Sequence, residues 1–149
     1  MCMIKIILFL VLIFLLFWVC RFIIGYLNLV ITRKLAFKSF IKIDKKITET
    51  YQDLKDASKY IAEYLEVEPN LKNIDRKIAL NYIVIQALDG GLDEVAKGAI
   101  EQLEASIKSD KEAYNKLASR LKYALEVFPS SYIGRLMEMR AVDFFKLRN

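Results

Sequence analysis

The stretch IILFLVLIFLLFWVC, residues 6–20, decides the fold of this chain, because its fifteen residues carry neither a charge nor a strong hydrogen-bonding side chain. Lys5 and Arg21 flank it, and apolar residues resume as far as Ile24. A helix from Met3 to Ile24 rises by about 1.5 Å per residue and covers roughly 30 Å, the thickness of a hydrocarbon core. A helix that is apolar on every face has no side to present to water. The sequence therefore predicts a transmembrane anchor over residues 1–25.

Three other kinds of segment are also apolar, and each fits this stretch less well. A cleaved signal peptide has small residues before its cleavage site, where this chain has Phe17, Trp18 and Val19. A lipoprotein signal also requires small residues before its cysteine, and Val19 precedes Cys20. A buried core helix would not carry Leu, Ile and Phe on every face. We therefore expect an anchor that is not cleaved.

The charges around the apolar segment predict its orientation. Residues 21–46 hold seven basic side chains and one acid, Asp44, whereas only Lys5 precedes the segment. Basic flanks stay on the cytoplasmic side, so we expect the N-terminus outside and the main domain in the cytoplasm. The basic residues that we take as a lipid-headgroup collar are Arg21, Arg33, Lys34 and Lys38.

The distribution of charge argues against nucleic-acid binding, although the formal net charge is +5. Residues 47–149 hold 15 basic and 17 acidic side chains, so the positive excess lies beside the membrane, where it favours anionic lipid. The distal part of the chain has no basic groove with interleaved aromatic residues. We expect membrane lipid as a partner, and no nucleic acid.

The chain lacks the residue types that most enzymes and metal sites use. It has no histidine, no glycine-rich phosphate loop and no cysteine pair with metal-ligand spacing. Cys2 and Cys20 lie about 27 Å apart along a helix, too far to bridge each other, although either could be acylated. We therefore expect no catalysis, no cofactor and no metal site.

The segment Leu27–Leu65 contains neither proline nor glycine, and its apolar residues recur every three or four positions, which predicts one long amphipathic helix. Two heptad positions form its apolar side. The first holds Phe37, Asp44, Tyr51, Ser58 and Leu65, and the second holds Phe40, Ile47, Leu54 and Ile61. Asp44 is the one carboxylate among them. We expect it to pair with a buried partner and to fix the helix register, with ligand binding as the alternative.

Glu68, Pro69 and Asn70 end this helix, because proline disfavours helical geometry in the residue before it. A second helix, Leu71–Leu88, is apolar on several faces, so we expect it to be the central, most covered member of a bundle. Asp89-Gly90-Gly91 reads as a turn between helices.

A third helical pattern covers Leu92–Phe128. Ser109 and Glu112 could form a capping box, which leaves a break at 109–110 open. A short amphipathic segment, Tyr132–Met139, follows Pro129. Its predicted apolar side consists of Ile133, Leu136, Met137 and Met139.

The predicted fold class is all-α, an N-terminal transmembrane helix followed by a bundle of long helices. We divide the chain into the anchor, residues 1–25, a cytoplasmic helical bundle, residues 26–139, and a C-terminal tail, residues 140–149. Phe144 and Phe145 in the tail would be unfavourable if exposed, so we expect them to pack on the bundle or to contact membrane or partner.

Two parts of the chain resemble the LemA family of bacterial membrane-anchored helical proteins. Behind the anchor, the order and spacing of the family are matched by Leu29, Val30, Arg33, Phe40, Ile43 and Asp44. In the C-terminal half they are matched by Glu104, Ile107, Tyr114, Asn115, Phe128, Pro129, Ser130, Ile133, Leu136, Phe144 and Phe145. The segment Thr48–Leu54 and residues 66–100 depart from the family pattern. The resemblance implies an antiparallel bundle in the cytoplasm of a bacterium, anchored in the inner membrane, and implies no catalytic residues.

The first functional hypothesis is a membrane-tethered scaffold that binds an unknown protein partner or self-associates. Its candidate interaction residues are Asp44, Tyr132, Ile133, Leu136, Phe144 and Phe145. The alternative is a small membrane-tethered adaptor of the tetratricopeptide kind. Four residues fall near the spacing of the second helix of such a repeat: Leu117, Leu121, Ala124 and Pro129. An enzyme or ion-handling protein would require a cluster of buried carboxylates around Asp44.

Overall fold

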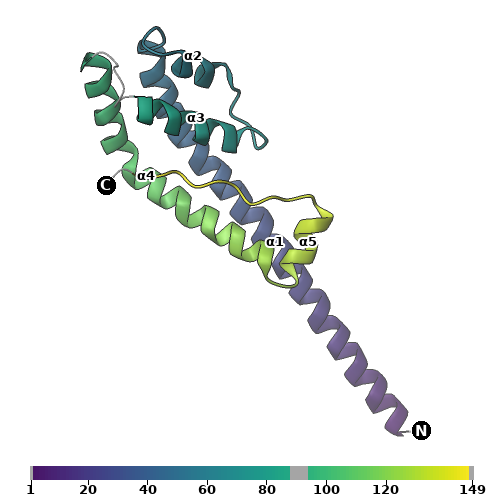
Figure 1. Cartoon of the computed structure of the whole chain (residues 1–149). Coiled ribbons are helices and arrows are strands. Elements are labelled where there is room, and N and C mark those ends of the chain that lie inside the picture. The colour runs from purple at the N-terminus through teal and green to yellow at the C-terminus, as the bar shows by residue number, and fades with distance from the viewer. Residues whose placement is uncertain (1, 88–93, 148–149) are drawn as a thin grey trace.

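The computed structural model describes residues 2–87 and 94–147, and within these residues the protein is all-α, as predicted (Figure 1). No strand occurs in the described part of the chain. The helices are α1 (Cys2–Asp53), α2 (Lys59–Glu66), α3 (Ile74–Ala87), α4 (Glu94–Glu126) and α5 (Ser130–Leu136).

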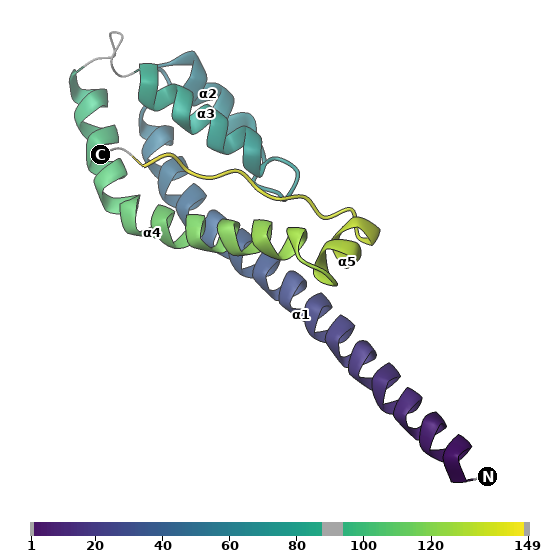
Figure 2. The same ribbon diagram turned by 60° about the horizontal axis from the view of Figure 1, so that its bottom comes forward.

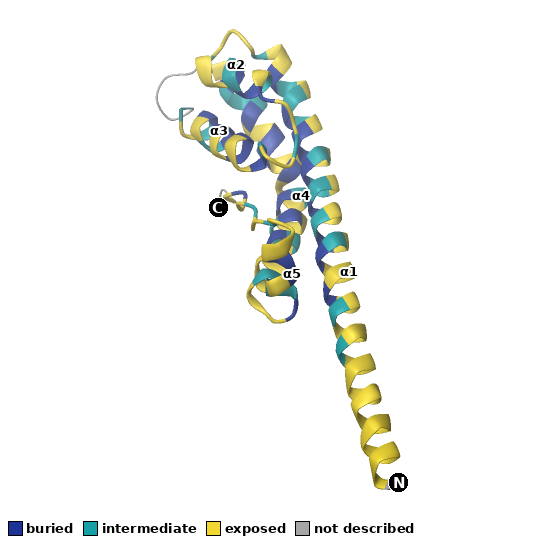
Figure 3. Ribbon diagram, turned by 90° about the vertical axis from the view of Figure 1, so that its right-hand side faces the viewer, coloured by how far each residue is buried: buried dark blue, intermediate teal, exposed yellow. Residues whose placement is uncertain are grey.

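Helix α1 is one unbroken helix of 52 residues that has two different surroundings along its length. Its large apolar side chains from Met3 to Phe17 are exposed, and from Leu29 onward one face is buried in the bundle. Figure 3 shows this change as a helix that is yellow at its N-terminal end and carries a dark blue stripe further along. Among the described residues, α1 is the one helix long and apolar enough to cross a membrane.

The prediction that the first helix continues to Leu65 is wrong. Helix α1 ends at Asp53, the chain turns through residues 54–57, and α2 begins after Ser58. Ser58 adopts an extended conformation and its hydroxyl accepts a hydrogen bond from the Tyr60 N–H, so it caps α2. The reversal is stabilised by tertiary contacts, because it brings Tyr64 back over Tyr51 with the two rings 5.1 Å apart.

Helices α1 and α4 run antiparallel and form the most extensive helix–helix contact of the fold. Phe40 of α1 lies beside Tyr114 of α4, and Phe22 lies beside Phe128 just after α4, so residue numbers fall on one helix as they rise on the other. Helix α4 is continuous for 33 residues, which rules out the break at 109–110. Leu92 and the predicted turn at Gly90-Gly91 lie outside the described residues.

The prediction that the second predicted helix is the central one is also wrong. Its structural counterpart, α3, packs mainly against α2 at one end of the bundle, and Ile83 on its outer side is exposed. The central helix is the bundle part of α1, which contacts α2, α4 and α5. Helix α3 buries only one stripe, and that stripe contains the polar residues Lys77 and Asn81.

Helix α5 and the tail close the bundle. The predicted segment Tyr132–Met139 is helical only as far as Leu136, and its helix starts earlier, at Ser130. Ile133 is buried as expected, but Leu136 and Met137 are exposed, so only part of the predicted apolar side packs. After α5 the chain is extended and lies between α3 and α4 (Figures 1 and 2).

Candidate functional site

Three features of the fold could carry a function: two polar centres in the core and an exposed corner beside the apolar part of α1. The first polar centre surrounds Asp44 of α1. Lys77 of α3 donates a hydrogen bond to Oδ1 of Asp44 at 2.7 Å, and the Tyr64 hydroxyl of α2 donates to the same oxygen at 2.7 Å. The Lys77 and Asp44 side chains are 3% and 6% exposed. The prediction of a buried partner for Asp44 is therefore confirmed.

A second contact and a hydrogen bond extend this centre. The Lys77 ammonium lies 4.3 Å from the centroid of the Tyr64 ring, within the range of a cation–π interaction. The Tyr51 hydroxyl donates a buried hydrogen bond to Oδ1 of Asn81 at 2.9 Å. Burial, followed by the charge of Asp44, raises the pKa of Tyr64, and burial raises that of Tyr51. Both phenols therefore stay protonated and act as hydrogen-bond donors.

The Asp44 centre connects α1, α2 and α3 through hydrogen bonds, so its role is to stabilise the fold. An ion-handling site would need further carboxylates around Asp44, and the side chains that contact it are a lysine and a tyrosine. In the described ranges, 2–87 and 94–147, no group of three or more potential metal ligands occurs. As an interaction candidate, Asp44 is buried and faces the bundle interior.

The second polar centre lies within α4. Lys111 Nζ contacts both carboxylate oxygens of Glu104, at 2.7 and 2.6 Å, and both side chains are buried. Burial lowers the pKa of Lys111, and the nearby Glu104 charge opposes this effect. Sequence reasoning missed that Lys77, Glu104 and Lys111 are buried. The available signal was their position on apolar helical stripes, since Glu104 and Lys111 are seven residues apart and flank Ile107.

The tail docks next to this second centre. The Phe145 ring is buried, stacks on Phe40 at 6.3 Å and meets Tyr114 edge-on at 5.2 Å. The Asn115 side-chain amide donates to the Phe145 carbonyl at 2.7 Å and accepts from the Phe145 N–H at 2.8 Å. The Tyr114 hydroxyl donates to the Asp143 carbonyl at 3.1 Å. Phe145, an interaction candidate in the sequence, is thus a core residue, whereas Phe144 is exposed.

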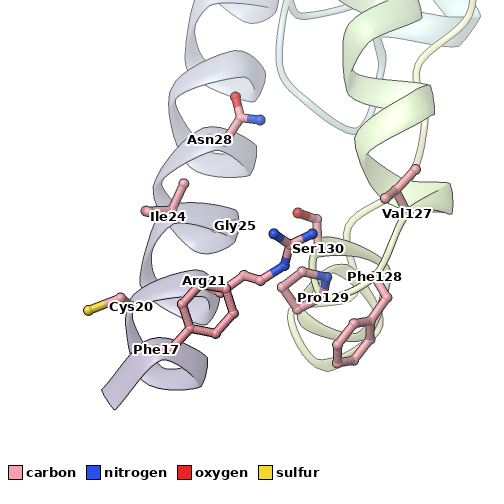
Figure 4. Close-up of a pocket in the computed structure, with 10 residues that line it drawn as sticks. All are labelled: Phe17, Cys20, Arg21, Ile24, Gly25, Asn28, Val127, Phe128, Pro129 and Ser130. Carbon is pink, nitrogen blue, oxygen red and sulfur yellow. The ribbon is translucent and has the colours of Figure 1, made fainter. Parts of the chain in front are cut away.

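The third feature is the α4–α5 corner, which we define as residues 126–136. It packs against α1 at the point where the apolar segment ends. The Phe128 ring lies 5.6 Å from both Trp18 and Phe22, and the Tyr132 ring lies 6.5 Å from Phe22. A cleft of about 340 Å³ lies between α1 and the corner, and its mostly apolar lining includes Arg21, Asn28 and Ser130 (Figure 4).

The remaining candidate residues distribute around this corner and along α1. Tyr132 and Leu136 are exposed on α5, while Ile133 is buried in a small cluster with Leu29 and Leu121. Of the predicted headgroup collar, three residues are exposed and one is half-buried. The exposed ones are Arg21, Lys34 and Lys38, and the half-buried one is Arg33.

Arg33 faces a second groove, of about 810 Å³, on the side of the bundle. This groove also has Lys72 and Arg140 as basic residues and Asp75 and Glu138 as acids. Its mixed charge does not single out one kind of ligand. The α4–α5 corner is therefore the surface that best combines exposure with a defined position relative to the apolar helix.

Comparisons of the chain with protein-family models, with curated proteins and with solved structures gave no match.

Proposed function

We propose that this protein is a membrane-anchored, non-catalytic scaffold or interaction protein of the LemA type, whose bundle stands on the cytoplasmic face of a bacterial inner membrane. The observation that carries the proposal is the construction of α1. One continuous helix supplies both the exposed apolar segment and the central helix of the bundle. A bundle built in this way is held at a fixed position relative to whatever surrounds the apolar segment.

Charge supports the proposed orientation. The exposed basic residues Arg21, Lys34 and Lys38 follow the apolar segment on the side of the bundle. Each basic side chain near an anionic membrane surface contributes on the order of 1 kcal/mol to binding. Basic residues on this side of a span favour retention of the bundle in the cytoplasm.

The LemA type is proposed from the sequence likeness, and several of the residues that carry this likeness contact one another in the fold. Asn115 and Phe145 are matched in the sequence 30 residues apart, and they share two hydrogen bonds. Phe40, matched near the anchor, packs on Phe145 and Tyr114. One packing arrangement thus requires several of the separate motifs at once.

The buried carboxylates favour a role without catalysis, because each is paired with a lysine inside the bundle. The carboxylates of Asp44 and Glu104 are paired with Lys77 and Lys111. Their positions in the core leave them remote from the exposed corner. The tetratricopeptide-like alternative is not favoured, because helices of 52 and 33 residues differ from the short paired helices of such repeats.

Three experiments test the proposal. Membranes containing the full chain are washed with high salt and with carbonate, and a version lacking residues 1–25 is the control. We expect the full chain to stay in the pellet and the shortened version to wash off. Release of the full chain would contradict the proposed anchor.

Orientation is tested by labelling with a membrane-impermeant maleimide. Lys59→Cys, in a chain whose two natural cysteines are replaced by serine, places a thiol at the start of α2. We expect labelling only after the cells are opened. Crosslinking in intact membranes then tests the scaffold role, and recovery of monomer alone, with no partner, would count against it.

A further inference from the structure

The α4–α5 corner exposes large apolar side chains right beside the apolar part of α1. Phe128 is 49% exposed and Leu136 is 69% exposed, and Val127 and Tyr132 in the same corner are exposed as well. Isolated exposed apolar residues need no explanation, but a group of them next to an apolar helix indicates a surface that something covers.

The contacts fix where this corner lies along α1. Phe128 touches Trp18 and Phe22, and Tyr132 touches Phe22. A Cβ on Gly25 would lie 3.0 Å from Ser130 Oγ, so the start of α5 almost touches the α1 backbone there. The corner is therefore level with residues 18–25 of α1, the last turns of the apolar segment.

This level corresponds to a definite depth if residues 3–24 cross a bilayer. Residues 18–24 account for the last 9 Å or so of such a span, at about 1.5 Å per residue. The headgroup region adds roughly 5–7 Å on each side of the hydrocarbon core. Side chains packed laterally on residues 18–25 then lie at the boundary between hydrocarbon and headgroups, where Trp and Tyr are enriched in membrane proteins.

The basic residues near the corner fit the same surroundings. Arg21 extends from α1 toward Pro129 and Ser130 across the cleft (Figure 4). Arg135 is exposed on α5. Within the described residues, neither guanidinium forms an ion pair with a carboxylate, so both are available to lipid phosphates.

We propose that the α4–α5 corner is a second membrane contact, which places Phe128, Tyr132 and Leu136 in the headgroup–hydrocarbon boundary of the leaflet that α1 leaves. The inference rests on the proposed function, since it requires α1 to span a bilayer. The occupant of the surface is lipid and not a second copy of the chain. The corner continues the exposed apolar surface of α1, and Arg135 of the corner and Arg21 of α1 form no ion pair among the described residues. Two contacts with one leaflet would fix the tilt of the bundle as well as its height.

The single tryptophan of the chain, Trp18, allows a direct test. The full chain is reconstituted into vesicles of phosphatidylcholine and phosphatidylglycerol that carry bromine on the acyl chains, either near the headgroup or near the chain end. In a Trp18→Phe background, Phe128→Trp and Leu136→Trp report on the corner. Tyr60→Trp, at an exposed aromatic position of α2 at the far end of the bundle, is the matched control.

We expect bromine near the headgroup to quench the tryptophan fluorescence of Phe128→Trp and Leu136→Trp several-fold more than that of Tyr60→Trp. Of the two corner variants, Phe128→Trp should emit at the shorter wavelength. Leu136→Trp guards against misfolding, because residue 136 is mostly exposed and its replacement leaves the core intact. Circular dichroism verifies the helix content of each variant.

The outcomes separate this proposal from the one on which it rests. If Trp18 in the natural chain is quenched while both corner probes emit as in water, the corner does not touch lipid and the anchor stands. Corner emission that is shifted to short wavelength without quenching would mean that protein covers the surface, which also overturns the proposal. If Trp18 itself is not quenched, the anchor and the proposed function fail first.

Discussion

Replacing Lys77 by methionine is expected to destabilise the bundle by about 3–5 kcal/mol, because it leaves the buried Asp44 carboxylate without its cation. Methionine fills most of the space of the lysine side chain, so the loss reports charge more than volume. The partner change, Asp44→Asn, is expected to cost a similar amount, since the neutral amide can still accept a hydrogen bond from Lys77 but leaves the buried ammonium without a counter-charge.

The two changes together should cost much less than their sum. The ammonium and the carboxylate are 2.7 Å apart and 3% and 6% exposed, so neither can be solvated once the other is gone. Removing both leaves neutral side chains, and replacing a whole buried pair is often close to neutral. We expect a coupling energy of at least about 2 kcal/mol, at the upper end of what contacting residues show.

The assay is equilibrium unfolding of the full chain by urea in detergent micelles, followed by circular dichroism, with the free energy extrapolated at constant m value. The matched control is Lys45→Met, whose partner Glu49 lies 3.9 Å away with side chains 78% and 65% exposed, and its loss should stay below about 0.5 kcal/mol. Losses that simply add for Lys77→Met and Asp44→Asn would refute the reasoning, and so would a loss no larger than that of the control.

Three further predictions concern the tail, α4 and the pH dependence of stability. Asn115→Ala removes both hydrogen bonds to the Phe145 backbone, so we expect the free energy of unfolding to fall by about 1–3 kcal/mol and proteolysis of the tail to become faster. The control is Lys116→Ala at the exposed neighbouring position, which should change neither quantity. A tail that resists proteolysis equally in both variants would contradict the contact. Gly98→Ala should stabilise α4 by about 0.5–1 kcal/mol, because a Cβ there meets no atom within 4 Å; a lowered melting temperature would count against this. Hydrogen bonds from two lysines of α1 lower the pKa of Asp110 below its ordinary 3.8. Asp110 therefore contributes stability above pH 3.8 that is lost as the pH falls through its lowered pKa. Asp110→Asn should cost about 0.5–1 kcal/mol near neutral pH, and unfolding curves should show this difference vanishing in acid.

Several features of the fold could be read from the sequence because they depend on local patterns. The apolar segment, the long fourth helix and the end of a helix near Pro69 follow from composition and spacing. The buried partner of Asp44 was also predictable in kind, since a carboxylate on an apolar stripe needs compensation. Its identity, Lys77, was not, because the two residues are 33 positions apart and meet only through the fold.

The end of α1 at Asp53 shows what local patterns cannot supply. Residues 54–58 contain neither glycine nor proline, and the heptad spacing continues through them. The turn forms because Ser58 caps α2 and because Tyr64 then reaches Asp44 and Tyr51, which are contacts between distant residues. The prediction that Leu136 packs on a buried apolar side was wrong for a different reason. Its spacing fits such a side, but α5 is too short and too peripheral to bury it.

The uninterrupted backbone of α1 has a mechanical consequence. The helix has no proline, and its one glycine, Gly25, is buried against the corner, so its sequence provides no hinge between its exposed apolar part and its bundle-forming part. In the proposed arrangement, a rotation of the span about its own axis turns the bundle through the same angle. A vertical shift likewise moves every surface of the bundle by the same distance. A change in bilayer thickness or lateral pressure that moves the span would therefore also move any protein docked on the bundle.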